Sequence, residues 1–78
     1  MIGDKDKILK QRQKSYELLI NHFGTLSKTA VALGTSRQNV ARWEKNGIPI
    51  WWVKKIYKLT NYELTVEDLR ADVADLLS

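Results

Sequence analysis

Residues 25–47 read TLSKTAVALGTSRQNVARWEKNG, and this stretch decides how the chain folds. Two segments of helical length, 26–33 and 37–46, are separated by Gly-Thr-Ser at 34–36. A short turn containing glycine between two helices is typical of the helix-turn-helix motif. We therefore predict that residues 26–46 form such a motif.

Four residues mark the ends of these two helices. Thr25 and Ser36 stand immediately before the helical segments, where a side-chain oxygen can accept a hydrogen bond from a free backbone N–H. Gly34 and Gly47 stand immediately after them, where glycine ends a helix at positive φ with little strain. Ala30 is small at a point where the two helices must approach each other closely. Val40 and Trp43, one turn apart, are predicted to anchor the second helix in the core.

Three further helices are predicted from apolar residues that recur at helical spacing. They span residues 7–22, 50–60 and 66–77, the second opened by Pro49 and the third capped by Thr65. The polar first half of segment 7–22 is expected to fray. The apolar positions are Leu9, Tyr16, Leu19, Ile20 and Phe23, then Trp52, Val53, Ile56 and Leu59, then Val66, Leu69, Val73 and Leu76. Since no strand pattern is visible, the predicted fold class is all-α, a compact domain of five helices.

The length and the charge distribution limit what the domain can bind. The 78 residues suffice for one domain, predicted over 15–78, with 1–14 as a basic extension or the start of the first helix. Residues 1–14 hold five Lys or Arg and two Asp (net +3), and residues 15–62 hold seven and two Glu (net +5). Residues 63–78 hold one Arg and five acidic residues (net −4). A basic body with an acidic end suits a polyanionic partner.

Several classes of function are disfavoured by what the sequence lacks. There is no cysteine, and His22 is the single histidine, so a metal site is not expected and His22 is interpreted as a structural residue. No nucleophile motif, phosphate-binding glycine loop or acid/base pair is visible, so we expect neither an enzyme nor a cofactor or small-molecule ligand. No apolar run approaches the length of a membrane span, and no signal peptide is recognised, which favours the cytoplasm.

The outward face of the segment 37–46 carries the functional prediction. At 100° per residue, its polar side chains and one alanine fall within about 140°, opposite Val40 and Trp43. Arginine can donate two hydrogen bonds to guanine, glutamine can pair with adenine, and an alanine lets the helix approach the bases. These residues are Arg37, Gln38, Ala41, Arg42 and Lys45, with Lys45 a candidate for either phosphate contact or free solvation.

The sequence HFGTLSKTAVALG at 22–34, followed by TSRQNVARW at 35–43, resembles the Cro-like phage repressors and especially the YdaS-type prophage regulators. Ile48-Pro49 and VEDLR at 66–70 fit the same branch, and the resemblance covers roughly residues 16–72. It implies a lambda-repressor-like helix-turn-helix fold and a repressor that binds operator half-sites in double-stranded DNA. It also implies a homodimer, which forms either in free solution or only when the protein is bound to DNA.

The resemblance assigns roles to individual positions. Ser36, Arg37, Gln38, Ala41 and Arg42 match positions that read the operator, and Thr25 and Ser27 match positions that hold phosphate. Lys28, Lys45 and Lys54 are added as phosphate candidates. The chain departs from the pattern at Ala71, where a proline is common, so that the last helix is expected to run on. It also departs at the pair Trp51-Trp52 and in its long N-terminal extension.

Three surfaces are left with alternative interpretations. Trp51, among Lys54, Lys55 and Lys58, is either an exposed aromatic with solvated lysines or a dimer contact, with Tyr62 and the region of Leu64 as rivals. The basic residues of the extension either bind phosphate or belong to the solvent-exposed start of a helix. They are Lys5, Lys7, Lys10, Arg12 and Lys14.

The leading functional hypothesis is a sequence-specific transcriptional repressor of phage or prophage type. The alternative is an antitoxin-type regulator whose main role is to bind a protein partner, with the tryptophans and the acidic end as its interface. A third hypothesis, non-specific packaging of nucleic acid, predicts that Arg37→Ala weakens binding to every sequence alike.

Overall fold

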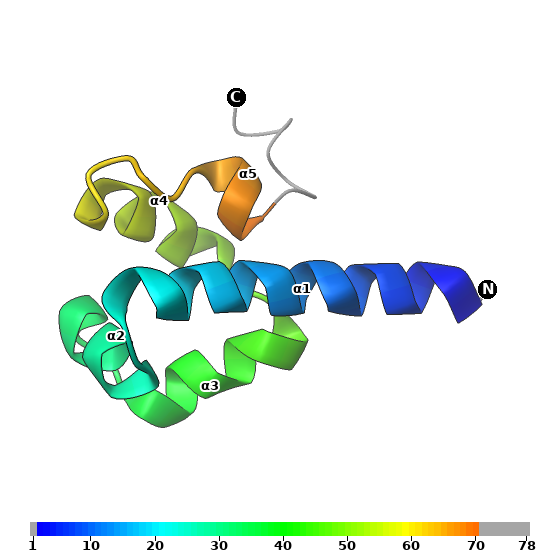
Figure 1. Cartoon of the computed structure of the whole chain (residues 1–78), viewed down its shortest axis with the longest axis horizontal. Helices are drawn as coiled ribbons and strands as arrows, with labels where there is room; N and C mark the ends of the chain where they lie inside the picture. The colour runs from blue at the N-terminus through cyan, green and yellow to red at the C-terminus, as the bar shows by residue number, and fades with distance from the viewer. Residues whose placement is uncertain (1, 71–78) are drawn as a thin grey trace.

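A computed structural model describes residues 2–70 of the chain, with side chains from residue 7 onward. These residues form five helices and no strand (Figure 1), which confirms the predicted all-α class. The helices are α1 (Ile2–Phe23), α2 (Leu26–Leu33), α3 (Arg37–Asn46), α4 (Ile50–Leu59) and α5 (Val66–Leu69).

Helix α1 is the long axis on which the other helices pack. In Figure 1, α2 and α3 lie on one side of α1, whereas α4 and α5 lie on the other. Direct contacts join α1 to α2, α3 and α5, and join α4 to α5. The rings of Trp43 in α3 and Trp52 in α4, with centroids 5.5 Å apart, link the two sides of the fold.

The turn of the helix-turn-helix has the local interactions that its sequence predicts. Thr25 Oγ1 accepts a hydrogen bond from the Lys28 N–H at 3.1 Å, and Ser36 Oγ accepts one from the Asn39 N–H at 3.1 Å. Gly34 ends α2 in the left-handed region, with φ of 72°. The predicted bounds of α2 and α3 are therefore confirmed, because side-chain caps and a glycine stop act within a few residues of the chain.

The core is built from residues of all five helices and from the segments between them. Val40 and Trp43 are buried, as predicted, and Ala30 lies where α2 contacts α3. Ile48 and Leu64, which lie outside the helices, are also buried. The buried apolar residues are Leu19, Ala30, Leu33, Val40, Trp43, Ile48, Val53, Ile56, Leu64 and Leu69.

Three predictions about α1 were wrong. The helix begins at Ile2 rather than near residue 7, and its polar half continues as regular helix instead of fraying. Residues 7–14 consist mainly of Lys, Gln, Arg and Leu, which favour helix without burial. Leu9, assigned to the apolar stripe, is exposed. The N-terminal part of α1 projects beyond the other helices (Figure 1), so a stripe there has little to pack against.

Two predictions near the C-terminal side were also wrong. Leu59 was assigned to the apolar face of α4 but is exposed, and Thr60 is buried in its place. The Thr60 hydroxyl donates to Tyr57 O and accepts from Leu64 N–H, so its polar group is satisfied inside the fold. Helix α5 ends at Leu69, since the backbone of Arg70 leaves the helical region, with φ of −146° and ψ of 74°. Val73 and Leu76 lie outside the described residues.

Candidate nucleic-acid interface

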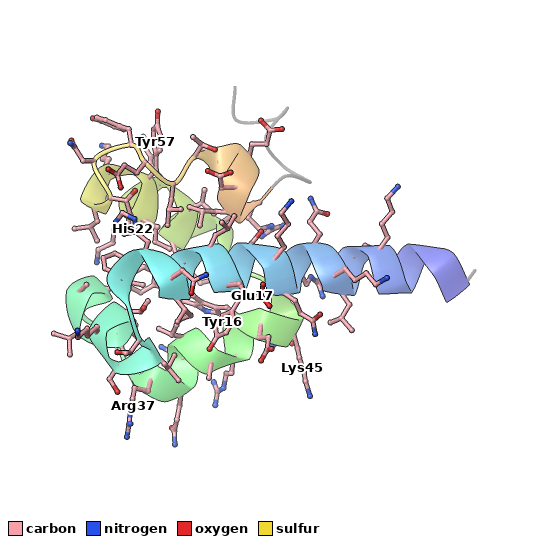
Figure 2. All side chains as sticks on the ribbon, viewed as in Figure 1. Tyr16, Glu17, His22, Arg37, Lys45 and Tyr57 are labelled. Atoms are coloured by element: carbon pink, nitrogen blue, oxygen red, sulfur yellow. The ribbon has the colours of Figure 1, made fainter. Side chains whose placement is uncertain are left out.

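The outward face of α3 is formed by the residues predicted to read DNA. In Figure 2, Arg37 near the start of α3 and Lys45 near its end both point away from α1. Val40 and Trp43 hold the opposite side of α3 in the core. The residues of the outward face are all exposed: Ser36, Arg37, Gln38, Ala41, Arg42 and Lys45.

The charge on this face is almost wholly positive. The single carboxylate of α3, Glu44, lies at the edge of the face, next to α1. Its neighbour there is Tyr16, whose pKa is raised above 10.0, first by burial of the hydroxyl and second by the negative charge of Glu44. The rest of the face, with Gln38, Arg42 and Lys45, therefore presents donors to solvent, and the one acidic group of the helix lies at its edge.

The start of α2 lies beside the start of α3 and adds further donors. Arg37 Nη1 donates to Ser27 Oγ at 3.4 Å, which joins the two helices at the surface. Thr25, Ser27 and Lys28 are all exposed around the N-terminus of α2. A helix N-terminus carries partial positive charge and free N–H groups, so this arrangement can hold an anion such as a phosphate.

The two capping hydroxyls, of Thr25 and Ser36, can each still donate a hydrogen bond to a ligand. Ser36 Oγ and Thr25 Oγ1 each accept one backbone hydrogen bond, and neither hydroxyl is needed there as a donor. Asn39 differs, because its side-chain amide donates to Thr35 Oγ1 at 2.9 Å. That contact holds Asn39 toward the turn and away from the centre of the outward face.

Arg12 has a role that sequence reasoning missed. Its Nη1 donates to Lys45 O at 3.0 Å, at the C-terminal end of α3. A Cβ atom at Gly47 would lie only 3.3 Å from Arg12 Nε, so the glycine gives the guanidinium its room. The cation also faces the negative end of the α3 dipole. Arg12 is thus engaged in the fold, whereas Lys7, Lys10 and Lys14 of the predicted basic arm are exposed. Lys5 lies among the residues whose side chains are not described.

Lys54, the remaining phosphate candidate, is not brought onto the face of α3. It lies in α4, and it lines a groove with Trp51 and Tyr57. Trp51 lies at the border between this groove and the outward face of α3, since it also lines a depression of about 440 Å³ together with Arg42. Lys54 and the face of α3 are therefore separated by the Trp51 ring.

The three candidate dimer residues differ in exposure. Trp51 is 74% exposed and Tyr62 is 57% exposed. Tyr62 has φ of 68°, and its ring packs edge-on against Tyr57, with centroids 4.8 Å apart. Leu64 is buried, so the prediction of a surface at Leu64 was wrong.

His22, the single histidine, has a structural partner. His22 Nδ1 lies 3.4 Å from Glu63 Oε2, which connects the end of α1 to the loop before α5. Among the described residues, no group of three or more His, Asp or Glu is placed to hold a metal ion. None of the helices in this part of the chain is both long enough and apolar enough to cross a membrane.

Comparison with known proteins gives one match. A family described as bacterial toxin YdaS matches residues 17–76, which include α2, α3, α4 and α5. No curated protein and no solved structure matches the chain significantly. The family match covers most of the chain, so the chain belongs to the YdaS family.

Proposed function

We propose that this YdaS-family protein is a sequence-specific DNA-binding regulator of the Cro-like repressor type. The observation that supports it best is the outward face of α3, on which Arg37, Gln38 and Arg42 are exposed around a small Ala41. In helix-turn-helix proteins the second helix lies in the major groove, with its first residues on the base edges. Occupation of an operator by this helix would block a promoter.

The long side chains would read bases, and the alanine would allow close approach. Arg37 and Arg42 can each donate in bidentate fashion to guanine O6 and N7, and Gln38 can pair with adenine N6 and N7. Ala41 lies between them and can contact a thymine methyl. Ser36 keeps a hydroxyl donor at the tip of the helix.

A second group of residues would hold the backbone. Thr25, Ser27 and Lys28 surround the N-terminus of α2, beside Arg37, and Lys45 flanks the other end of the face. Phosphate contacts of this kind fix the register of the protein and make the affinity depend on salt. Lys54 would join them only if the DNA backbone passes across Trp51.

Two copies of the chain would bind one operator. Recognition helices in successive major grooves lie roughly 34 Å apart, so a twofold dimer predicts a palindrome with that spacing. Tyr62 and Trp51 are the exposed aromatic residues available for the contact between copies. The lysines around Trp51 favour Tyr62, because a twofold axis would bring like charges together.

Selection from randomised duplex DNA, followed by sequencing, tests the proposal. We expect a recurring half-site, and we expect Arg37→Ala/Gln38→Ala to weaken its binding at least about tenfold, since one bidentate pair is worth about 1–3 kcal/mol. Lys58→Ala is the matched control, because it also removes one positive charge but lies on α4. Binding without an enriched sequence, unchanged in the double variant, would contradict the proposal.

The family description favours a second candidate function, that of a toxin or regulator that acts on a protein partner. In that case DNA binding would be secondary, and α4 would provide the interface. The variants separate the two functions: loss of the biological effect with Trp51→Ala but not with Arg37→Ala/Gln38→Ala would favour the second.

A further inference from the structure

The exposed face of α4 has a pattern that DNA reading by α3 does not use. At 100° per residue, Trp51 lies in the middle of the face, with Lys54 and Lys58 on one side and Lys55 on the other. All four residues are exposed, and α4 contains no acidic residue. Lys55 Nζ is held over the Trp52 ring, 4.7 Å from its centroid, which leaves Lys54 and Lys58 for solvent.

Beside this row lies a groove with an apolar floor. The groove has a volume of about 430 Å³ and runs between α4 and the start of α5. Its lining residues are Ile50, Trp51, Val53, Lys54, Tyr57, Lys58 and Val66. In the described part of the chain, neither Lys54 nor Lys58 has a carboxylate within ion-pair distance. An aromatic residue exposed beside an apolar groove is typical of an interface anchor.

We propose that this surface, the α4 groove, binds an acidic amphipathic segment of a partner protein. An apolar side chain of the partner would enter the groove against Trp51, Ile50 and Val66. Carboxylates on either side of that anchor would pair with Lys54 and Lys58. Helical segments present such side chains at positions i, i+3, i+4 and i+7.

The charge pattern argues against the simplest rival, a second copy of this face. A twofold dimer places the same patch of each subunit against itself. Two α4 faces would then bring Lys54 and Lys58 of both copies together without an acidic residue of α4 to compensate them. Like charges in an interface oppose association.

The apolar floor distinguishes a protein partner from the DNA backbone. A phosphodiester chain can use the two lysines, but it has no apolar group to place against Ile50 and Val66. An acidic peptide uses both features of the surface. The inference does not depend on DNA reading by α3, because Arg37, Gln38 and Ala41 do not line the groove, and the two surfaces meet at Ile50 and Trp51.

A random peptide library displayed on phage, selected against the full chain, tests the inference. We expect enrichment of peptides with acidic residues around a large apolar side chain at helical spacing. A synthetic copy of the most enriched peptide should move the Trp51 indole signal in the NMR spectrum. Its affinity should fall at least about tenfold in Trp51→Ala, as for a buried interface anchor, and by a similar factor in Lys54→Glu/Lys58→Glu.

Lys7→Glu/Lys10→Glu is the matched control, because it makes the same charge change on α1, away from the groove. The proposal requires that this variant retain the peptide affinity of the unchanged chain. Enriched peptides without acidic residues, or equal weakening by both charge reversals, would overturn it.

Three other results would overturn the proposal in favour of a different occupant. Movement of the Trp51 indole signal by a duplex of unrelated sequence, without peptide enrichment, would assign the α4 groove to DNA. Self-association of the free chain that is lost in Trp51→Ala would assign it to a second copy. A rise in peptide affinity in Asp72→Asn/Asp75→Asn would assign it to the acidic end of the same chain. The DNA selection proposed above is scored independently, so either proposal can fail alone.

Discussion

The faces of α3 and α4 carry similar charge but differ at their centres. Each presents exposed basic side chains in ordered helix, and neither has an acidic residue in its middle. On α3 the basic residues surround Ala41, whereas on α4 they surround Trp51 beside an apolar groove. A flat polar face suits base edges and phosphates, and an aromatic beside a groove suits a protein. Positive charge alone therefore does not separate the two proposed partners, and the proposals depend on the residue at the centre of each face.

The largest expected effect is on stability, and it distinguishes Trp43 from Trp51, the two tryptophans that differ most in burial. Trp43 is 4% exposed and packs on Trp52, so it joins α3 to α4. Trp43→Ala should lower the free energy of unfolding by about 3–5 kcal/mol, the usual cost of removing a large aromatic from a core. Urea unfolding measures this. Trp51→Ala, the matched control, should change stability by less than about 0.5 kcal/mol, and equal effects would show that the packing is misassigned.

Helices α3 and α4 also differ in how their first turns are capped. Helix α3 begins with a side-chain cap from Ser36, whereas α4 begins at Pro49 without one. Ser36→Ala should therefore cost about 1 kcal/mol of stability. Ser36→Asn retains a capping oxygen and should cost little. If both variants weaken operator binding but only Ser36→Ala unfolds more easily, the hydroxyl contacts DNA as well as capping the helix.

Salt dependence distinguishes the lysines of the two faces. The slope of log affinity against log salt falls by about 1 for each phosphate contact that is lost. Lys45→Ala should lower the slope for duplex DNA by that amount, and Lys58→Ala should leave it unchanged. A reduced slope in Lys58→Ala would extend the DNA surface across Trp51 and remove the distinction between the two faces.

The smallest effect concerns the edge of the α3 face, where Tyr16 meets Glu44. Because folding raises the pKa of Tyr16, the unfolded chain loses that proton first as the pH rises. Stability is therefore unaffected by this group below pH 10 and falls between pH 10 and the raised pKa. Tyr16→Phe should reduce the alkaline loss of stability, measured by urea unfolding as a function of pH. Tyr62→Phe, which removes an exposed hydroxyl, is the control, and equal behaviour of both would contradict the assignment.

Local signals account for the predictions that were confirmed. Thr25, Gly34 and Ser36 act on neighbouring backbone groups, so the bounds of α2 and α3 follow from the sequence. The burial of Val40 and Trp43 follows from the helical period. Burial at Leu9 and Leu59 was predicted from the same period and was wrong, because the period identifies a face without showing whether another element covers it.

The sequence by itself determined the all-α class, the helix-turn-helix bounds and the residues on the outward face of α3. Each depends on contacts within a turn or two of the chain. Only the tertiary structure decided that Arg12 binds the C-terminal end of α3, and that Trp51, Lys54 and Val66 border one groove. Arg12 is far from α3 in the sequence, as Val66 is from Trp51 and Lys54, and no local period or cap relates these segments. Their meeting depends on how α1, α4 and α5 pack, which is a property of the whole core.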